Sequence, residues 1–277
     1  MAEGGDASPG RGAVRPARGV PGWLYLPALV GFALVVIPPI ALTQRLPWRD
    51  FWSSITSESS LQALELSLRT AVISTVLCLL IGVPMAIVFA RSDGVALRVV
   101  RALVLLPLVL PPVVGGIALL YAFGRRGLIG EHLTVLGVDI AFSTTAVVLA
   151  QTFVALPFLV ISVEGALRVS GSSYEQVAAT LGAGPTRTLV RVTIPLVAPA
   201  LLSGLVLAFA RAMGEFGATI TFAGNAPGVT QTAPLKIYVD EINDPQQALP
   251  LSFVLIVVAL VVVVAVHLRR PGRQPVL

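Results

Sequence analysis

The stretch IAFSTTAVVLAQTFVALPFLVISV (140–163) decides the fold of this chain, because it holds 24 consecutive uncharged residues between Asp139 and Glu164. A helix rises about 1.5 Å per residue, so about 20 apolar residues cross the roughly 30 Å hydrocarbon core of a bilayer. Over all 277 residues, 56% are apolar and 12% are charged, whereas an ordinary soluble domain carries about 25% charged residues. A soluble fold could not cover so much apolar surface. We therefore expect an all-α polytopic membrane protein.

Seven uncharged runs of 19 to 26 residues lie between the charged residues of the chain. The run after Glu215 contains Gly, Pro and Asn at a density that a lipid-spanning helix does not tolerate. Six runs remain, and they predict six transmembrane helices within a membrane domain over 22–268. The expected spans are residues 22–43, 67–90, 99–123, 141–163, 196–222 and 248–268.

The segments outside these spans predict the orientation. Residues 1–21 are rich in Gly, Pro and Arg, which favours a disordered tail. The apolar run after them is about 20 residues long and lacks an A-x-A-like exit, which favours an uncleaved first span over a signal peptide. With the N-terminus in the cytoplasm, the inner segments carry 12 basic residues and the outer segments carry five, as the positive-inside rule requires. The tails 1–21 and 269–277 and the segment 164–195 are then cytoplasmic.

Motifs of enzymes are absent from the sequence. The one lysine, Lys236, follows a leucine, so the Gly-Lys pair of a phosphate-binding loop is missing, and we expect no ATP hydrolysis by this chain alone. His132 and His267 fall on opposite predicted sides and cannot share a metal ion, and Cys78 is the only cysteine. We therefore expect no catalytic residue, no metal or other cofactor and no nucleic-acid partner. Transport is the favoured class.

The inner segment 164–195 predicts a helix, a turn and a second helix. A serine can cap a helix that begins near Tyr174, a glycine can end it, and a proline suits the first turn of the next helix. By spacing alone this segment could equally be an amphipathic surface loop. The residues concerned are Ser172 or Ser173, Gly182 or Gly184, and Pro185.

The same segment resembles the EAA loop of binding-protein-dependent ABC importer permeases. In that family E-A-A is followed by three residues, Gly, nine residues and I-x-L-P. The spacing is kept here by QVA (176–178), Gly182 and VTIP (192–195), with substitutions in the first and last groups, and Glu175 is a candidate for the displaced carboxylate. The resemblance implies that this loop couples the chain to an ATPase subunit. The candidate coupling residues are Glu175, Gln176, Ala178, Ala179, Gly182 and Pro195.

Further stretches between about residues 65 and 245 are similar to the oxyanion branch of that family, in particular to molybdate permeases. Sulfate permeases share much of the pattern. The stretches are LSLRT (66–70), GVPMA (82–86), LPLVLPPVVG (106–115), RAMGEFGAT (211–219), FAGN (222–225) and QTAPLKIY (231–238).

This resemblance implies a type I ABC importer permease in a bacterial cell membrane. The chain would work as a homodimer, seated on a separate ATPase subunit and fed by an extracytoplasmic oxyanion-binding protein. The ion would be molybdate, with sulfate and tungstate as alternatives. An ion-coupled secondary transporter is the rival class, but such folds often show inverted repeats, and no repeat of the 66–90 pattern occurs in the second half. A membrane-embedded assembly factor is a weaker rival.

Two groups of residues are candidates for the translocation machinery. Arg211 and Glu215 stand four apart at membrane depth and can pair on one helical face. The pair is either structural or lines the pathway, where Gly214 and Gly217 would allow close approach. A second group, rich in Pro and Gly, is either a kink that only shapes packing or a hinge. The hinge candidates are Pro107, Pro111, Pro112 and Gly115.

Overall fold

The computed structural model describes residues 21–268, and every regular element among them is helical. The expected tails 1–21 and 269–277 lie outside these residues, apart from Pro21. The chain divides into two compact units, residues 1–44 and 45–277.

The first unit contains one long helix. The 3₁₀ turn η1 (Gly22–Leu24) leads into α1 (Tyr25–Gln44), which carries no charged residue and includes Pro38 and Pro39. The hydroxyl of Thr43 donates to the carbonyl of Pro39 at 2.8 Å. A helix that is apolar on every side, with a mean hydropathy of 2.2, is typical of a membrane span.

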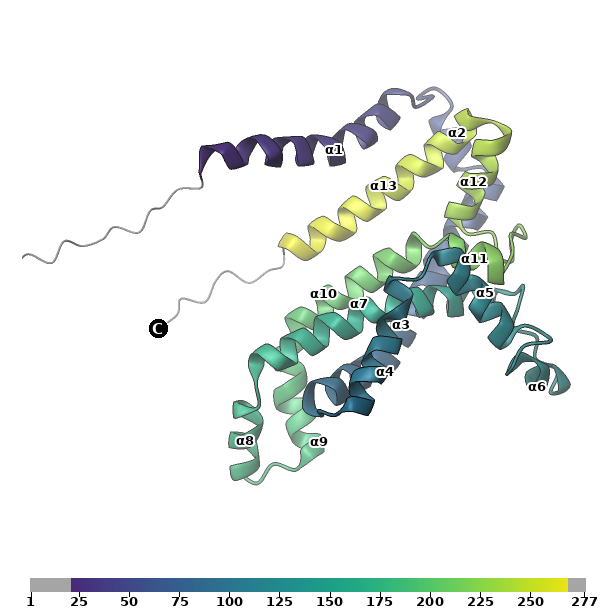
Figure 1. The fold of residues 1–277 in the computed structure, drawn as a ribbon. Helices are drawn as coiled ribbons and strands as arrows, with labels where there is room; N and C mark the ends of the chain where they lie inside the picture. The colour runs from purple at the N-terminus through teal and green to yellow at the C-terminus, as the bar shows by residue number, and fades with distance from the viewer. Residues whose placement is uncertain (1–20, 269–277) are drawn as a thin grey trace, which may run out of the picture. The chain divides into compact units, whose positions relative to one another are not determined.

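The second unit is a helical bundle whose members are labelled in Figure 1. Among the described residues, five helices including α1 are long and apolar enough to cross a membrane, or six if a bent pair counts as one span. This confirms the predicted all-α membrane fold. The elements are α2 (Phe51–Ile55), α3 (Glu58–Arg91), α4 (Val95–Leu105), η2 (Leu106–Leu108), α5 (Pro112–Phe123), α6 (Gly130–Val135), α7 (Thr144–Ser170), α8 (Ser173–Thr180), α9 (Pro185–Thr188), η3 (Leu189–Thr193), α10 (Ile194–Met213), α11 (Gly217–Phe222), α12 (Ala233–Asn243) and α13 (Pro245–Leu268).

Helix α7 lies at the centre of the bundle, between α3 and α10 (Figure 1). Its most apolar window is 67% buried, a larger share than in any other described span. Small residues of α3 allow close packing: a Cβ added at Gly82 would lie 3.0 Å from Leu156 of α7. The second half of α7 shares one buried core with α3 and α10. Its first half shares another core with α5 and α11 around Leu119, Val147 and Phe222. One helix therefore belongs to both cores.

Polar side chains also join the helices. The hydroxyl of Ser74 on α3 donates to the carbonyl of Val148 on α7 at 3.0 Å and lies 3.1 Å from the side chain of Gln151. The amide of Ala233, at the start of α12, donates to the hydroxyl of Ser67 at 2.7 Å. Such bonds between helices stabilise bundles in lipid, where apolar burial supplies little.

The third expected span, 99–123, is bent. Helices α4 and α5 meet at 117° across a break at residues 109–111. Proline lacks the amide hydrogen and clashes with the preceding turn, so Pro107, Pro111 and Pro112 explain the break. The kink anticipated from the sequence is therefore present.

The fifth expected span, 196–222, differs from the structure at both ends. Helical conformation runs from Pro185 to Met213 through the π-helical turn η3, and it stops before Gly214. These 29 residues extend for about 43 Å at 1.5 Å per residue, so no continuation past Glu215 is needed to cross a bilayer. The expectation of one helix over 196–222 is wrong because the extra length lies before Leu196, in residues that charge counting assigned to a loop.

The segment between the two long helices is shorter than the expected cytoplasmic segment 164–195, because the helices extend into both of its ends. Helix α7 continues to Ser170, which places Glu164 inside the helix, and α9 begins at Pro185. The excursion between the two long helices is therefore residues 171–184, with α8 at its centre.

Candidate functional site

The excursion 171–184 has the helix-turn-helix form predicted from its sequence. Ser172 precedes α8 as its N-cap residue, and Gly184 precedes α9, in which Pro185 occupies the first turn. Gly182 has a φ of +81°, a conformation that only glycine adopts without strain. The glycine and proline signals therefore agree with the structure, and Ser172 occupies the expected cap position but makes no side-chain capping hydrogen bond.

One face of α8 is apolar and uncovered. Tyr174, Val177 and Leu181 are 62%, 58% and 82% exposed, and their spacing of three and four residues places them on the same side of the helix. Gln176 is also exposed, and its amide donates to the hydroxyl of Ser172 at 3.0 Å. An exposed apolar stripe on a short helix is a surface suited to a partner protein.

Glu175 points away from that face and into the body of the protein. Its Oε1 lies 2.6 Å from Nη2 of Arg91, the last residue of α3, and accepts a 2.7 Å hydrogen bond from the hydroxyl of Thr193. Arg91 also donates to the carbonyl of Gly171 at 3.0 Å. The predicted coupling residues are thus divided: Glu175 and Ala178 are partly buried, whereas Gln176, Ala179, Gly182 and Pro195 are exposed.

A second ionic cluster lies at the same end of the bundle. Glu164 Oε1 is 2.9 Å from Arg101 of α4 and 2.8 Å from Arg168 of α7. Both arginines also donate to the carbonyl of Phe89 in α3 at 2.7 Å. In the sequence, these arginines indicate only the orientation of the chain in the membrane. The contact between Glu164 and Arg168 follows from their i, i+4 spacing. Nothing in the sequence indicates the contact of Arg101 with Glu164 or the hydrogen bonds of the two arginines to Phe89.

The Arg211–Glu215 pair predicted from spacing is present at the end of α10. Nη1 of Arg211 lies 2.6 Å from Oε2 of Glu215, and the two side chains are 28% and 1% exposed. The other oxygen, Oε1, accepts the amide hydrogen of Ala218 at 2.7 Å. Glu215 therefore uses both oxygens, and it satisfies a free backbone donor at the start of α11. The i, i+4 spacing predicts the ion pair but not this capping contact.

Of the hinge candidates, Pro112 packs against the break between α10 and α11 at residues 214–216, and Gly115 packs against α7. A Cβ added at Gly217 would lie 2.6 Å from Cβ of Pro112, and one added at Gly115 would lie 3.1 Å from the ring of Phe153. Gly116, which lies beside the hinge candidates, makes a closer contact: a Cβ there would overlap the hydroxyl of Thr221 and would lie 2.6 Å from the carbonyl oxygen of Ala218. The doublet Gly115-Gly116 in an apolar run is the sequence signal that could have identified it. The breaks around 109–111 and 214–216 are therefore joined by glycine contacts.

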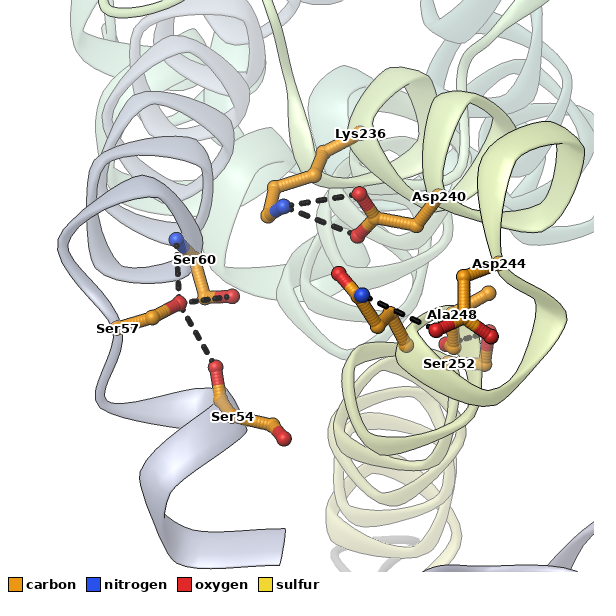
Figure 2. Close-up of polar contacts among 9 residues, drawn as sticks. Ser54, Ser57, Ser60, Lys236, Asp240, Asp244, Ala248 and Ser252 are labelled. Atoms are coloured by element: carbon orange, nitrogen blue, oxygen red, sulfur yellow. Dashed lines mark hydrogen bonds and ion pairs between the residues drawn. The ribbon is translucent and has the colours of Figure 1, made fainter. Parts of the chain in front are cut away.

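Another polar cluster lies around the start of α3 and the ends of α12 and α13. Figure 2 shows the Lys236 ammonium directed to the carboxylate of Asp240. Both side chains are 13% exposed, and the shorter contact between them is 2.9 Å. In the same view Ser57 caps α3 by accepting the amide hydrogen of Ser60 at 3.3 Å. At the start of α13, Gln247 donates to Asp244 at 3.1 Å. These contacts stabilise helix ends. Within the described residues, no group of three or more His, Cys, Asp or Glu side chains could hold a metal ion.

The comparison with known families identifies the class of protein that has this fold and this excursion, a transport permease. The family model of the binding-protein-dependent transport system inner membrane component matches residues 53–270. The chain belongs to this family. It is a multi-pass membrane permease of the ABC importer kind, and the family is not a class of enzymes.

Relatives within the family narrow the resemblance to its molybdate branch. The chain is 59% identical over 258 residues to the molybdenum transport system permease protein ModB of Mycobacterium tuberculosis, covering 93% of this chain and 98% of the relative. It is 42% identical over 185 residues to ModB of Escherichia coli, covering 66% and 81% of the two chains. The resemblance to molybdate permeases found in the sequence is therefore confirmed.

Solved structures show the same fold at low sequence identity. A bacterial alginate ABC transporter, solved in complex with an alginate pentasaccharide-bound periplasmic protein, matches with a TM-score of 0.66 and 19% identity over 90% of this chain and 93% of that chain. The MetNI methionine ABC transporter in inward-facing conformations matches with a TM-score of 0.59 and 18% identity over 76% and 96%. The chain thus has the fold of type I ABC importer permeases.

Proposed function

We propose that this chain is the membrane-spanning subunit of an importer that carries molybdate into the cytoplasm. The observation that carries this proposal is the 59% identity to a ModB protein over nearly the whole of both chains. Sulfate is the main alternative ion, because a probable sulfate permease of Chlorokybus atmophyticus is 33% identical over 75% of this chain. Tungstate is a further alternative, because it has the same shape and charge as molybdate.

A separate ATPase subunit supplies the energy in this proposal. The exposed stripe of Tyr174, Val177 and Leu181 is suited to an apolar groove on that subunit, in the way that an amphipathic helix docks its apolar face. The exposed candidates Gln176, Ala179 and Gly182 lie beside the stripe. The conformational change on ATP binding would thus reach the permease at the excursion 171–184.

The bent span of α4 and α5 and the short helix α11 that packs against it form the moving part of the pathway. The break around 109–111 is the hinge, and the glycine contacts of Gly116 and Gly217 carry its movement to α11. We assign the Arg211–Glu215 pair a structural role beside the pathway, because the carboxylate is buried and uses both oxygens. A carboxylate neutralised in this way does not repel a passing anion.

The permease acts as a homodimer in a bacterial cell membrane, with both termini in the cytoplasm. The excess of basic residues in the segments assigned to the inside supports this orientation. The outer segments carry five basic and eight acidic residues, so they do not concentrate anions by themselves. An extracytoplasmic binding protein would capture the ion, and the periplasmic protein named with the alginate transporter supports such a partner.

Reconstitution tests this function. The chain is incorporated into proteoliposomes with its ATPase subunit and binding protein, and uptake of labelled molybdate is measured with and without ATP. ATP-dependent uptake that excess unlabelled molybdate suppresses, and that a protonophore leaves unchanged, is expected. Uptake that follows an ion gradient without ATP would place the chain among secondary transporters, and suppression by sulfate alone would reassign the ion.

A further inference from the structure

Arg91 joins both ends of the link between α7 and α8. One guanidinium nitrogen donates to the carbonyl of Gly171, just after α7, at 3.0 Å, and another lies 2.6 Å from Glu175 in the first turn of α8. These partners are 80 and 84 residues away in sequence. Because one planar group holds two points of the excursion, the start of α8 is fixed relative to the end of α3.

Glu175 has a second partner that extends the connection. The hydroxyl of Thr193, which is buried in the π-helical turn η3, donates to the same carboxylate oxygen at 2.7 Å. A single side chain therefore connects α8 to α3 and to the helix that leads into α10. A cavity of about 490 Å³ lies around this contact, lined by Arg91, Glu175, Thr193 and apolar residues of α8 and α9.

We infer that Glu175 is a positioning residue that ties the excursion 171–184 to α3, and that it does not contact the ATPase subunit. This inference rests on the proposed function, in which the excursion docks on that subunit. The carboxylate is on the side of α8 that faces the bundle, whereas Tyr174, Val177 and Leu181 cover the outer side. Movement of α8 would pull on the end of α3 through Arg91.

The end of α3 is well placed to pass such movement on. Two residues before Arg91, the carbonyl of Phe89 accepts hydrogen bonds from Arg101 of α4 and Arg168 of α7. Both arginines contact Glu164. The helices α3, α4 and α7 thus meet where the excursion is attached, and α4 leads directly to the bend before α5.

A double-mutant cycle tests this role in the permease reconstituted with its ATPase subunit and binding protein. The variants are Arg91→Gln, Glu175→Gln and the double variant. Arg125→Gln is the matched control, because it breaks another exposed ion pair, with Asp139 at 3.0 Å, outside the excursion. Molybdate uptake per ATP hydrolysed and co-purification of the ATPase subunit are both measured. Size-exclusion chromatography verifies that each variant is folded.

Each single variant is expected to lower uptake per ATP by about fivefold, the upper end of the contribution of a partly exposed ion pair. The ATPase subunit still co-purifies, the double variant resembles the single ones, and Arg125→Gln keeps full coupling. Independent losses that multiply in the double variant, to about 25-fold by the same estimate, would overturn the inference. Release of the ATPase subunit by Glu175→Gln would overturn it as well, because the carboxylate would then be a docking contact.

Failure of the proposed function gives a different result. If the unmodified chain binds no ATPase subunit, or takes up the ion without ATP, the proposed function is wrong whatever the variants do. If the unmodified chain is coupled and Glu175→Gln is coupled equally well, only the positioning role is wrong.

Discussion

Replacing Arg211 with Gln should destabilise the permease more than replacing Glu215 with Gln. The two side chains form one ion pair of 2.6 Å, but their surroundings differ: Glu215 is 1% exposed and Arg211 is 28% exposed. Removal of Arg211 leaves a buried carboxylate whose remaining partner is the amide of Ala218. Removal of the charge on Glu215 leaves a guanidinium that can turn towards the surface.

The exposure of each partner sets the expected magnitudes. Breaking a fully buried pair costs about 3–5 kcal/mol, and because Arg211 is partly exposed we expect about 3 kcal/mol for Arg211→Gln. Glu215→Gln loses a hydrogen bond between charged groups, worth about 1.5–3 kcal/mol, but its amide oxygen can still accept from Ala218, so we expect about 1.5 kcal/mol. The double variant buries no unpaired charge and should cost no more than Glu215→Gln.

Denaturant unfolding in detergent micelles, followed by tryptophan fluorescence, measures these differences. Uptake in proteoliposomes is measured in parallel, because a double variant that is stable but inactive would place the pair in the pathway rather than in the scaffold. Equal losses for the two single variants would refute the argument from burial. A double variant whose loss is the sum of the single losses would show that the two side chains do not interact.

Three further predictions concern the breaks, the excursion and the topology. Gly116→Val should lower the unfolding free energy by more than the about 1–3 kcal/mol that overpacking usually costs, because its Cβ would press on the backbone of Ala218. An unfolding free energy that is unchanged in detergent micelles would contradict the close contact. Gly182→Val should introduce about 1–2 kcal/mol of local strain, because residue 182 has a φ of +81°. The variant should still insert into the membrane but show reduced ATP-driven uptake, and normal uptake would contradict the coupling role. For the topology, single cysteines are placed at the exposed positions Ser172 and Val229 in a chain without its native cysteine. They should react with membrane-impermeant reagents from opposite sides of the membrane, and reaction of both from one side would refute the predicted topology.

Local features of the fold could be predicted from the sequence because they depend on neighbouring residues. The i, i+4 spacing predicts the Arg211–Glu215 pair, and the glycine and proline at 182 and 185 predict the turn between α8 and α9. The contact of Arg91 with Glu175 spans 84 residues, and no local pattern reports a partner at that separation. Charge counting therefore located the apolar runs but could not show which way Glu175 points.

The helix ends were harder to predict for a related reason. Arg187 and Arg191 interrupt the apolar pattern, so the residues around them looked like loop, although they continue the helix that ends at Met213. Beyond the other end of that helix, the buried carboxylate of Glu215 accepts a hydrogen bond from the amide of Ala218 and so caps the start of α11. A charged residue can thus continue one helix and end another, and hydropathy alone does not distinguish the two.

The π-helical turn η3 between α9 and α10 sets the rotation of α9 around the helix axis as well as the length of the helix. A π turn holds one more residue than the α turn that it replaces, and one residue corresponds to about 100° of rotation around the helix axis. Deleting a single residue within 189–193 would therefore leave a continuous helix but rotate α9, and the end of the excursion joined to it, by about a quarter of a revolution relative to α10. The apolar stripe on α8 would then face a different direction relative to the membrane domain. The single additional residue in η3 thus acts as an angular adjustment between the part of the chain in the membrane and the part that meets a partner.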